Sequence, residues 1–270
     1  MPAQRTPAIV IRSRDYGEAD RIVTFLSPEA GRLTGLAKGA RKSKRRFLNS
    51  LEPFSRVTLI YTERPNRDLG RIDSCELVNA YPRLREDLNR LAVASCLTEL
   101  AGEIIGAQEN VGAIFSTLDY ALSQLDQGLP SESLLCSFLI RLLSLAGYGP
   151  RWDACLVCQQ VPAGPLWFSV AQGGIICEKC AGKTPGRLYP LKPGSWKLLR
   201  LAQDLPLEKL SRLRFSPLAQ NQCLALVRGF IQHHWGRELH SFTFLEKIGA
   251  QESRRPVKKR PGDDEPKRSE

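Results

Sequence analysis

The sequence predicts an α+β protein in which a small β-barrel comes first and a mainly helical domain, interrupted by a four-cysteine module, follows. Short apolar stretches separated by turn residues fill the first part of the chain, and apolar residues then recur at helical spacing from Leu84 onward. Two Cys-x-x-Cys pairs stand in a Gly- and Pro-rich segment further on. We therefore expect a barrel over 1–80, a helical domain over 81–250 with the cysteine module at about 150–190, and a disordered charged tail over 251–270.

Five stretches are expected to form the barrel. Each is rich in Ile, Val, Leu or Thr, and turn residues such as Gly, Pro, Asn and Asp separate them. Five strands in about 75 residues fit a small closed barrel, because closure leaves no exposed sheet edge. The expected strands are 8–14, 22–26, 32–37, 56–61 and 69–78.

Helical periodicity predicts most of the second domain. The helix that opens at Pro130-Ser131 has a wide apolar face, so we expect it to be a central, buried helix. Ser216-Pro217 is typical of an N-cap followed by proline at the first helical position. The other expected helices are 84–104, 114–125, 196–203 and 206–213, and the pattern at 239–248 is ambiguous.

The net charge of +11 favours a polyanionic partner such as nucleic acid. This charge is uneven, because the segment 1–80 carries 15 basic and 9 acidic residues whereas 81–154 carries 5 and 9. The barrel and the later cysteine region, 155–250 with 12 basic and 5 acidic residues, are therefore basic, and the first helices are acidic. No apolar run approaches the roughly 18 residues of a membrane span, and the N-terminus lacks the apolar core of a secretory signal. We expect a cytoplasmic protein with no membrane partner.

Cys155 and Cys158 form one close pair, and Cys177 and Cys180 form a second pair after eighteen intervening residues. This spacing is typical of a tetrahedral Zn²⁺ site, and in a cytoplasmic protein it favours metal over disulfides. No histidine or carboxylate stands nearby as a further ligand, so we expect one structural Zn²⁺. Core packing is the expectation for the isolated cysteines Cys75, Cys96, Cys136 and Cys223.

A run of basic residues without any acidic one is the main candidate for nucleic-acid contact. It spans 32–46, and a loop between barrel strands would lay these charges along a phosphate backbone. A solvated surface loop is the alternative interpretation. The candidate nucleic-acid-binding residues are Arg14, Arg21, Lys38, Arg41, Lys42, Lys44, Arg45 and Arg46. Few aromatic residues are candidates for base stacking, namely Tyr16, Phe47, Phe54 and Tyr61, so binding should depend on electrostatics.

Two weaker patterns point to catalysis, and neither is convincing. Asp15, Glu18 and Asp20 resemble a Mg²⁺ cluster of a nuclease, but a polar turn flanked by arginines explains them better. The segment Gly182-Lys183-Thr184 ends like a phosphate-binding loop, but the glycine that the pattern needs five positions earlier is absent. We therefore expect a protein without catalytic residues.

Several stretches closely resemble the RecO family of bacterial recombination mediators. The longest is 9–24, IVIRSRDYGEADRIVT, and 37–43, AKGARKS, follows a matching Gly31-Arg32-Leu33. Further matches are Leu51-Glu52-Pro53-Phe54, Leu145-Ala146-Gly147-Tyr148 and the stretch 234–245. The resemblance covers roughly residues 3–248 and leaves the tail outside.

This resemblance implies an N-terminal OB-fold barrel and a C-terminal helical domain, often with a zinc module. It further implies binding to single- and double-stranded DNA, strand annealing, and action with RecR to displace single-strand-binding protein so that RecA loads. The family's DNA-contacting basic residues match the stretch around Lys38 and Arg41. Some members lack the zinc cysteines, whereas this chain has all four.

Three other functions remain open from the residues alone. The first is a zinc-containing RNA-binding or regulatory nucleic-acid-binding protein, and the second is a metal nuclease that uses the acidic residues of the first turn. The third is a scaffold whose zinc module binds only protein. Preference for RNA, cleavage of DNA with Mg²⁺, or loss of partner binding alone on zinc removal would distinguish them.

Overall fold

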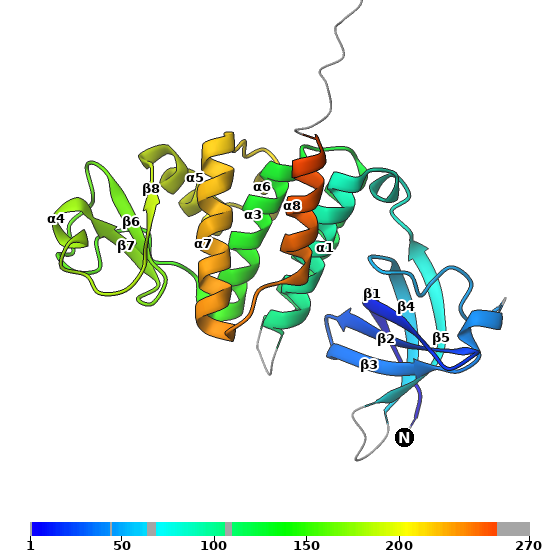
Figure 1. The fold of residues 1–270 in the computed structure, drawn as a ribbon. Helices are drawn as coiled ribbons and strands as arrows, with labels where there is room; N and C mark the ends of the chain where they lie inside the picture. Colours follow the sequence, from blue (N-terminus) through cyan, green and yellow to red (C-terminus); the bar gives the residue numbers. More distant parts are fainter. Residues whose placement is uncertain (1, 44, 64–68, 106–109, 253–270) are drawn as a thin grey trace, which may run out of the picture.

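The computed structural model describes the chain except residues 1, 44, 64–68, 106–109 and 253–270. Its three parts lie in a row (Figure 1): a β-barrel at one end, a helical bundle in the middle and a small three-stranded sheet at the other end. The predicted α+β class and the predicted order of its parts are confirmed. Most of the connection between the expected strands 56–61 and 69–78, and almost all of the expected tail, lie outside the described residues.

The barrel is closed and has the strand order β1-β2-β3-β5-β4. All pairings are antiparallel except that of β3 with β5, which is parallel and closes the barrel. Gly35 lies at this closure, and a Cβ atom there would lie 2.4 Å from Ile72 Cδ1. The strands are β1 (Gln4–Tyr16), β2 (Asp20–Ser27), β3 (Gly31–Ala37), β4 (Arg56–Thr62) and β5 (Gly70–Asn79), and a 3-10 helix η1 (Ala40–Lys42) follows β3.

The helical bundle is built around α3, as the wide apolar face predicted. Every residue of α3 except Glu132 and Arg141 is buried. The long helices are α1 (Leu88–Ile104), α2 (Val111–Asp126), α3 (Ser131–Leu143), α5 (Pro193–Asp204), α7 (Pro217–Trp235) and α8 (His240–Glu252). The short elements are η2 (Arg83–Glu86), η3 (Ser144–Tyr148) and α6 (Leu207–Leu210). Within the described part of the chain, no helix combines the length and the apolar character that a membrane span requires.

Helix ends follow the capping chemistry of the sequence. The Ser216 hydroxyl accepts a hydrogen bond from Ala219 N, and Pro217 takes the first helical position of α7, as predicted. The Asp87 side chain likewise accepts from Arg90 N at the start of α1. The ambiguous stretch near residues 239–248 is the helix α8, which packs against α1 (Figure 1).

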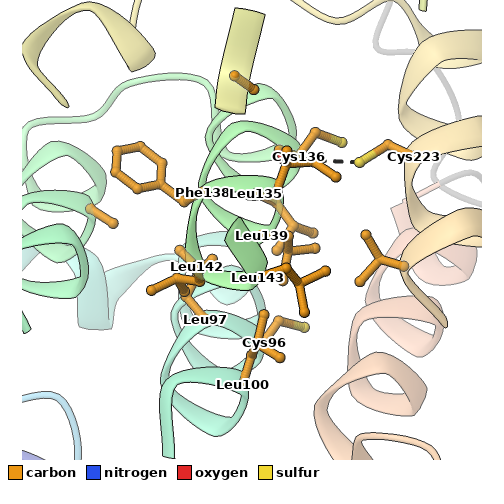
Figure 2. Packing of buried hydrophobic residues seen from close by; sticks show 14 of the residues in the cluster. Cys96, Leu97, Leu100, Leu135, Cys136, Phe138, Leu139, Leu142, Leu143 and Cys223 are labelled. Atoms are coloured by element: carbon orange, nitrogen blue, oxygen red, sulfur yellow. Dashed lines mark hydrogen bonds between the residues drawn. The ribbon is translucent and has the colours of Figure 1, made fainter. Parts of the chain in front are cut away.

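Three of the isolated cysteines lie in the bundle core (Figure 2). Cys96 on α1, Cys136 on α3 and Cys223 on α7 are fully buried among leucines. Burial raises the pKa of Cys96 to about 12, so this residue remains a neutral thiol. The prediction that these cysteines are core residues is confirmed, as it is for Cys75 in the barrel.

The barrel and the bundle share apolar and polar contacts. Ile9, Leu26 and Phe54 of the barrel belong to the same buried cluster as the helices. The Tyr81 hydroxyl donates to Asp119 Oδ1 at 2.7 Å across the junction. Arg85, just before α1, donates to the Pro53 carbonyl at 2.7 Å. These contacts fix the barrel against α1 and α2.

We expect Leu139→Ala to lower the free energy of unfolding by about 2–5 kcal/mol, because it opens a cavity in the most buried helix. Leu139 is 0% exposed and Figure 2 shows it in the middle of the cluster. The matched control is Leu201→Ala on α5, where the side chain is 45% exposed. The control should change the free energy by less than about 0.5 kcal/mol. Urea unfolding followed by circular dichroism measures both, and equal effects would show that α3 is not the centre of the core.

Candidate nucleic-acid interface and metal centre

The basic loop, residues 38–46, follows β3 and is held against the turn between β1 and β2. Gly39 has a positive φ of 67°, which glycine adopts without strain, and its N–H donates to Asp20 Oδ1 at 2.8 Å. Arg41 donates to the Glu18 carbonyl at 3.2 Å. The described part of the loop therefore has a defined path.

The acidic residues of the β1–β2 turn hold the basic loop against this turn. Asp15 pairs with Arg21 at 3.2 Å and with Arg41 at 3.6 Å, while Asp20 accepts from the loop backbone. Glu18 contributes its backbone carbonyl. Across the described residues, the one group of metal-ligating side chains is the cysteine group, so this turn does not form the Mg²⁺ cluster of the nuclease alternative. The interpretation as a polar turn is supported.

Some of the predicted basic residues are engaged with the protein itself. Arg21 forms ion pairs with Asp15 and with Glu52, the latter at 2.7 Å. The Arg46 guanidinium donates to the Lys38 carbonyl at 2.8 Å and lies 5.0 Å from the centre of the Phe47 ring. Together with Arg41, these side chains shape the loop and its surroundings.

The remaining predicted residues are available to a ligand. The side chains of Arg14, Lys38, Lys42 and Arg45 are exposed and have no hydrogen-bond or ion-pair partner among the described residues. Lys44 lies outside the described residues. Because no carboxylate neutralises these four charges, they leave a local positive field at one end of the barrel.

Three of the four aromatic residues expected to stack on bases are not available, and that prediction is wrong for them. Phe47 and Tyr61 belong to the barrel interior, and Phe54 packs at the junction with the bundle. Each is 9% exposed or less, whereas Tyr16 is 55% exposed. The pattern of turns and strands did not distinguish a buried ring from an exposed one in the segment 47–54.

A groove of about 400 Å³ next to the basic loop was not predicted. Its lining includes Arg45 and Arg46 of the basic loop and Arg5 on β1. Thr58 on β4 and Ser74 on β5 also line it. The alternation of side chains along a strand could have predicted these lining residues. Arg5, Thr58 and Ser74 are each next to a residue that points into the barrel, so their own side chains point outward.

The four cysteines come together at the far end of the molecule from the barrel (Figure 1). Their sulfur atoms all lie within 4.8 Å of one another. Cys155 and Cys158 stand on a turn, whereas Cys177 ends a strand and Cys180 lies in the short helix α4 (Glu178–Ala181). The Cys177 N–H donates to Cys155 Sγ at 3.4 Å, an arrangement that stabilises a thiolate.

A small sheet with the strand order β7-β6-β8 supports this cluster. The strands β6 (Leu166–Ser169) and β7 (Gly174–Cys177) form a hairpin, and β8 (Leu188–Leu191) adds the third strand. Trp152 connects the sheet to the bundle, since its ring lies 5.2 Å from that of Phe168 and its Nε1 donates to Gln203 on α5 at 2.7 Å.

The geometry fits a tetrahedral metal ion. Zinc–sulfur bonds of about 2.3 Å place the sulfurs of a tetrahedron roughly 3.8 Å apart, and Cys158 Sγ lies 3.7 Å from Cys177 Sγ. Burial opposes ionisation of Cys155, but hydrogen bonds from the backbone of Cys158, Cys177 and Val157 outweigh it and lower its pKa to about 6. For Cys180 the shift is upward: its side-chain hydrogen bond with Cys177 is the largest cause, and the pKa is raised to about 12. A bound cation would favour the thiolate form of all four.

Comparison with protein families identifies both parts of the chain. Residues 1–81 match the family described as Recombination protein O N terminal, and residues 85–242 match Recombination protein O C terminal. The chain belongs to the RecO family. This membership supports a role in recombination and DNA repair, as the sequence resemblance predicted.

RecO proteins of known sequence align with nearly the whole chain. The DNA repair protein RecO of Anaeromyxobacter dehalogenans strain 2CP-1 is 37% identical over 92% of this chain and 98% of its own length. The protein of the same name from Syntrophus aciditrophicus is 35% identical over 90% of this chain and 95% of its own. The DNA repair protein RecO of Myxococcus xanthus is 34% identical over 90% of this chain and 96% of its own length.

We expect Asp20→Ala to loosen the basic loop of this RecO-family protein without unfolding the barrel. The substitution removes the acceptor of the Gly39 N–H, and loss of one such bond costs about 1 kcal/mol. Amide hydrogen exchange of residues 39–42 should therefore become roughly fivefold faster. Asp20→Asn, which keeps a side-chain oxygen, is the control and should change exchange less. Unchanged exchange in Asp20→Ala would show that this contact does not hold the loop.

Proposed function

We propose that the chain is a non-catalytic DNA-binding recombination mediator of the cytoplasm, associated with the nucleoid. It binds single- and double-stranded DNA and promotes annealing of complementary strands. Together with RecR it loads RecA on strands that single-strand-binding protein has coated. Membership of the RecO family and the position of the unpaired basic side chains support this proposal.

One observation supports DNA binding more than any other. Lys38, Lys42 and Arg45 are exposed on the basic loop and have no partner among the described residues, while Arg41 and Arg46 hold the loop in shape. Cations fixed on a defined loop lose little conformational entropy when they meet phosphates. Contacts to phosphate carry no sequence information, so binding should tolerate any sequence and weaken with salt.

Annealing follows from the same charges. Two single strands repel each other through their phosphates, and a basic surface that binds both lowers this repulsion. The strands then pair through their own bases, so the protein needs neither a nucleotide nor a catalytic residue. The unpaired Arg14 extends the basic surface beyond the loop along β1.

We further propose that Cys155, Cys158, Cys177 and Cys180 hold one structural Zn²⁺. The metal would join the turn at Cys155 to the end of the β6–β7 hairpin. The barrel and the cysteine cluster lie at opposite ends of the bundle (Figure 1), which favours a role in stability over DNA contact.

Replacement of Lys38, Lys42 and Arg45 by alanine should weaken binding of single-stranded DNA at least roughly tenfold at low salt. It should also lower the slope of log affinity against log salt concentration by about 2, because each lost phosphate contact removes about 0.7. Fluorescence anisotropy with labelled oligonucleotides measures both quantities, and strand annealing should slow in parallel.

The control for this experiment removes the same charge from the helical domain through Lys197→Ala, Lys209→Ala and Arg212→Ala. These side chains are exposed and lie outside the barrel. If both triple variants bound DNA equally, the barrel would not be the DNA surface. A clear preference of the unaltered protein for RNA over DNA would instead favour the zinc-containing RNA-binding alternative.

Cys158→Ser should abolish stoichiometric zinc binding, measured by atomic emission as one ion per chain in the unaltered protein. Loss of the metal should expose residues 150–190 to trypsin, because the sheet there depends on the metal. Affinity for DNA should change less than roughly twofold if zinc is structural. Cys75→Ala is the control and should retain one zinc ion. A large loss of DNA affinity in Cys158→Ser alone would place the module in the DNA interface.

A further inference from the structure

A cavity of about 560 Å³ lies where the barrel meets the bundle, and we call it the junction cavity. Its barrel wall includes Arg12 on β1 and Arg32 on β3, and its helical wall includes Thr98 on α1 and Phe244 on α8. We propose that the junction cavity holds one unpaired nucleotide of single-stranded DNA, with the base against Phe244 and the phosphate at Arg12 and Arg32. This inference rests on the proposed function and adds a second contact to it.

Charge in the junction cavity favours an anion. Arg12 is exposed and has no hydrogen-bond or ion-pair partner within the described part of the chain. The two carboxylates in the walls are already engaged: Glu99 accepts from the backbone N–H groups of His240 and Ser241, and Glu103 pairs with Arg237. With Glu103 and Arg237 paired, Arg12 and Arg32 face the single charge of Glu99, so the lining keeps a net positive charge. Arg32 also donates to the Gly102 carbonyl at 3.1 Å, which holds its guanidinium at the cavity wall.

The cavity walls offer an aromatic ring and unpaired hydroxyl groups to a base. Phe244 is 37% exposed, so part of its ring is open to a ligand in the cavity. Thr98 is only 2% exposed, and its hydroxyl finds no hydrogen-bond partner among the described residues. The Ser13 hydroxyl on the barrel wall is also buried and unpaired there. Buried hydroxyls without partners are costly, and the edge of a base would satisfy them.

The place of the cavity in the fold agrees with this occupant. OB-type barrels bind oligonucleotides on the outer face of their second and third strands, and Thr24 on β2 and Arg32 on β3 lie in the cavity wall. The volume lies within the usual range of about 300–1,000 Å³ for small-molecule sites. Here the helices α1 and α8 cover part of that face and convert it into a recess.

Single-stranded and double-stranded DNA should differ in their use of this recess. A base in a duplex is paired and stacked, so it enters the cavity only if it leaves the helix, which costs energy. The basic loop contacts phosphates of either form. The junction cavity would therefore give the protein its preference for single strands, whereas the loop gives general affinity.

Phe244→Ala and Arg12→Ala should each lower affinity for single-stranded DNA roughly tenfold, because stacking and one phosphate contact are lost. Affinity for duplex DNA should change less than twofold. The matched controls are Leu218→Ala and Arg212→Ala, which remove an exposed apolar and an exposed basic side chain elsewhere. Circular dichroism establishes that each variant is folded.

Photocrosslinking gives an independent test that needs no substitution. An oligonucleotide that contains 5-iodouracil should crosslink to the peptide that carries Phe244, as identified by mass spectrometry. Crosslinks confined to residues 38–46, or an equal loss for single and double strands in Phe244→Ala, would overturn the junction cavity as a nucleotide site and leave the proposed function intact. Displacement of the crosslink by an acidic peptide but not by unlabelled DNA would assign the cavity to a protein partner. Absence of any DNA binding by the unaltered protein would overturn both proposals.

Discussion

One continuous apolar core connects the two ends of the molecule. It begins with Ile9 and Leu26 on the barrel, passes through the buried helix α3 and ends with Phe168 in the small sheet. Burial of such side chains is the dominant favourable term in folding, and it is not directional. Directional contacts such as Tyr81 with Asp119 then fix the angle at which the barrel meets the helices. The position of the basic loop and the shape of the junction cavity both depend on that angle.

The charges of the barrel have two different tasks. Arg21 and Arg41 are partly neutralised by Asp15 and hold the turn and the loop together, so they contribute little free field. Lys38 and Lys42 have no such partner in the part of the chain that the structure describes, so their charges are not neutralised there. A loop with six basic residues and no anchor would be pliable and would lose entropy on binding. By holding the loop in one shape, the acidic turn reduces the conformational entropy that the cations it does not neutralise would lose on binding.

The periodicity of apolar residues and the spacing of the cysteine pairs were enough to predict the order of barrel and helical domain, the central position of α3 and the four-cysteine cluster. Each of these features depends on residues that are close in the sequence. The aromatic residues show where this reasoning ends. Phe47 and Phe54 lie in an irregular segment without a period, so nothing local indicates that their rings are buried. The junction cavity was equally out of reach, since Arg12 and Phe244 meet only through the packing of α8 on α1. Contacts between distant elements require the tertiary structure.

Under the proposed function, two kinds of contact would let the protein hold a strand and still allow that strand to pair. Phosphate contacts on the basic loop leave the base edges free, so a bound strand can meet its complement there. A base in the junction cavity is withheld from pairing, but it anchors the strand at one point. The loop depends on several phosphate contacts, whereas the cavity combines one phosphate contact with stacking, which salt does not screen. The balance between them should therefore shift towards the cavity as ionic strength rises. The selectivity for single strands should then increase with salt even as total affinity falls.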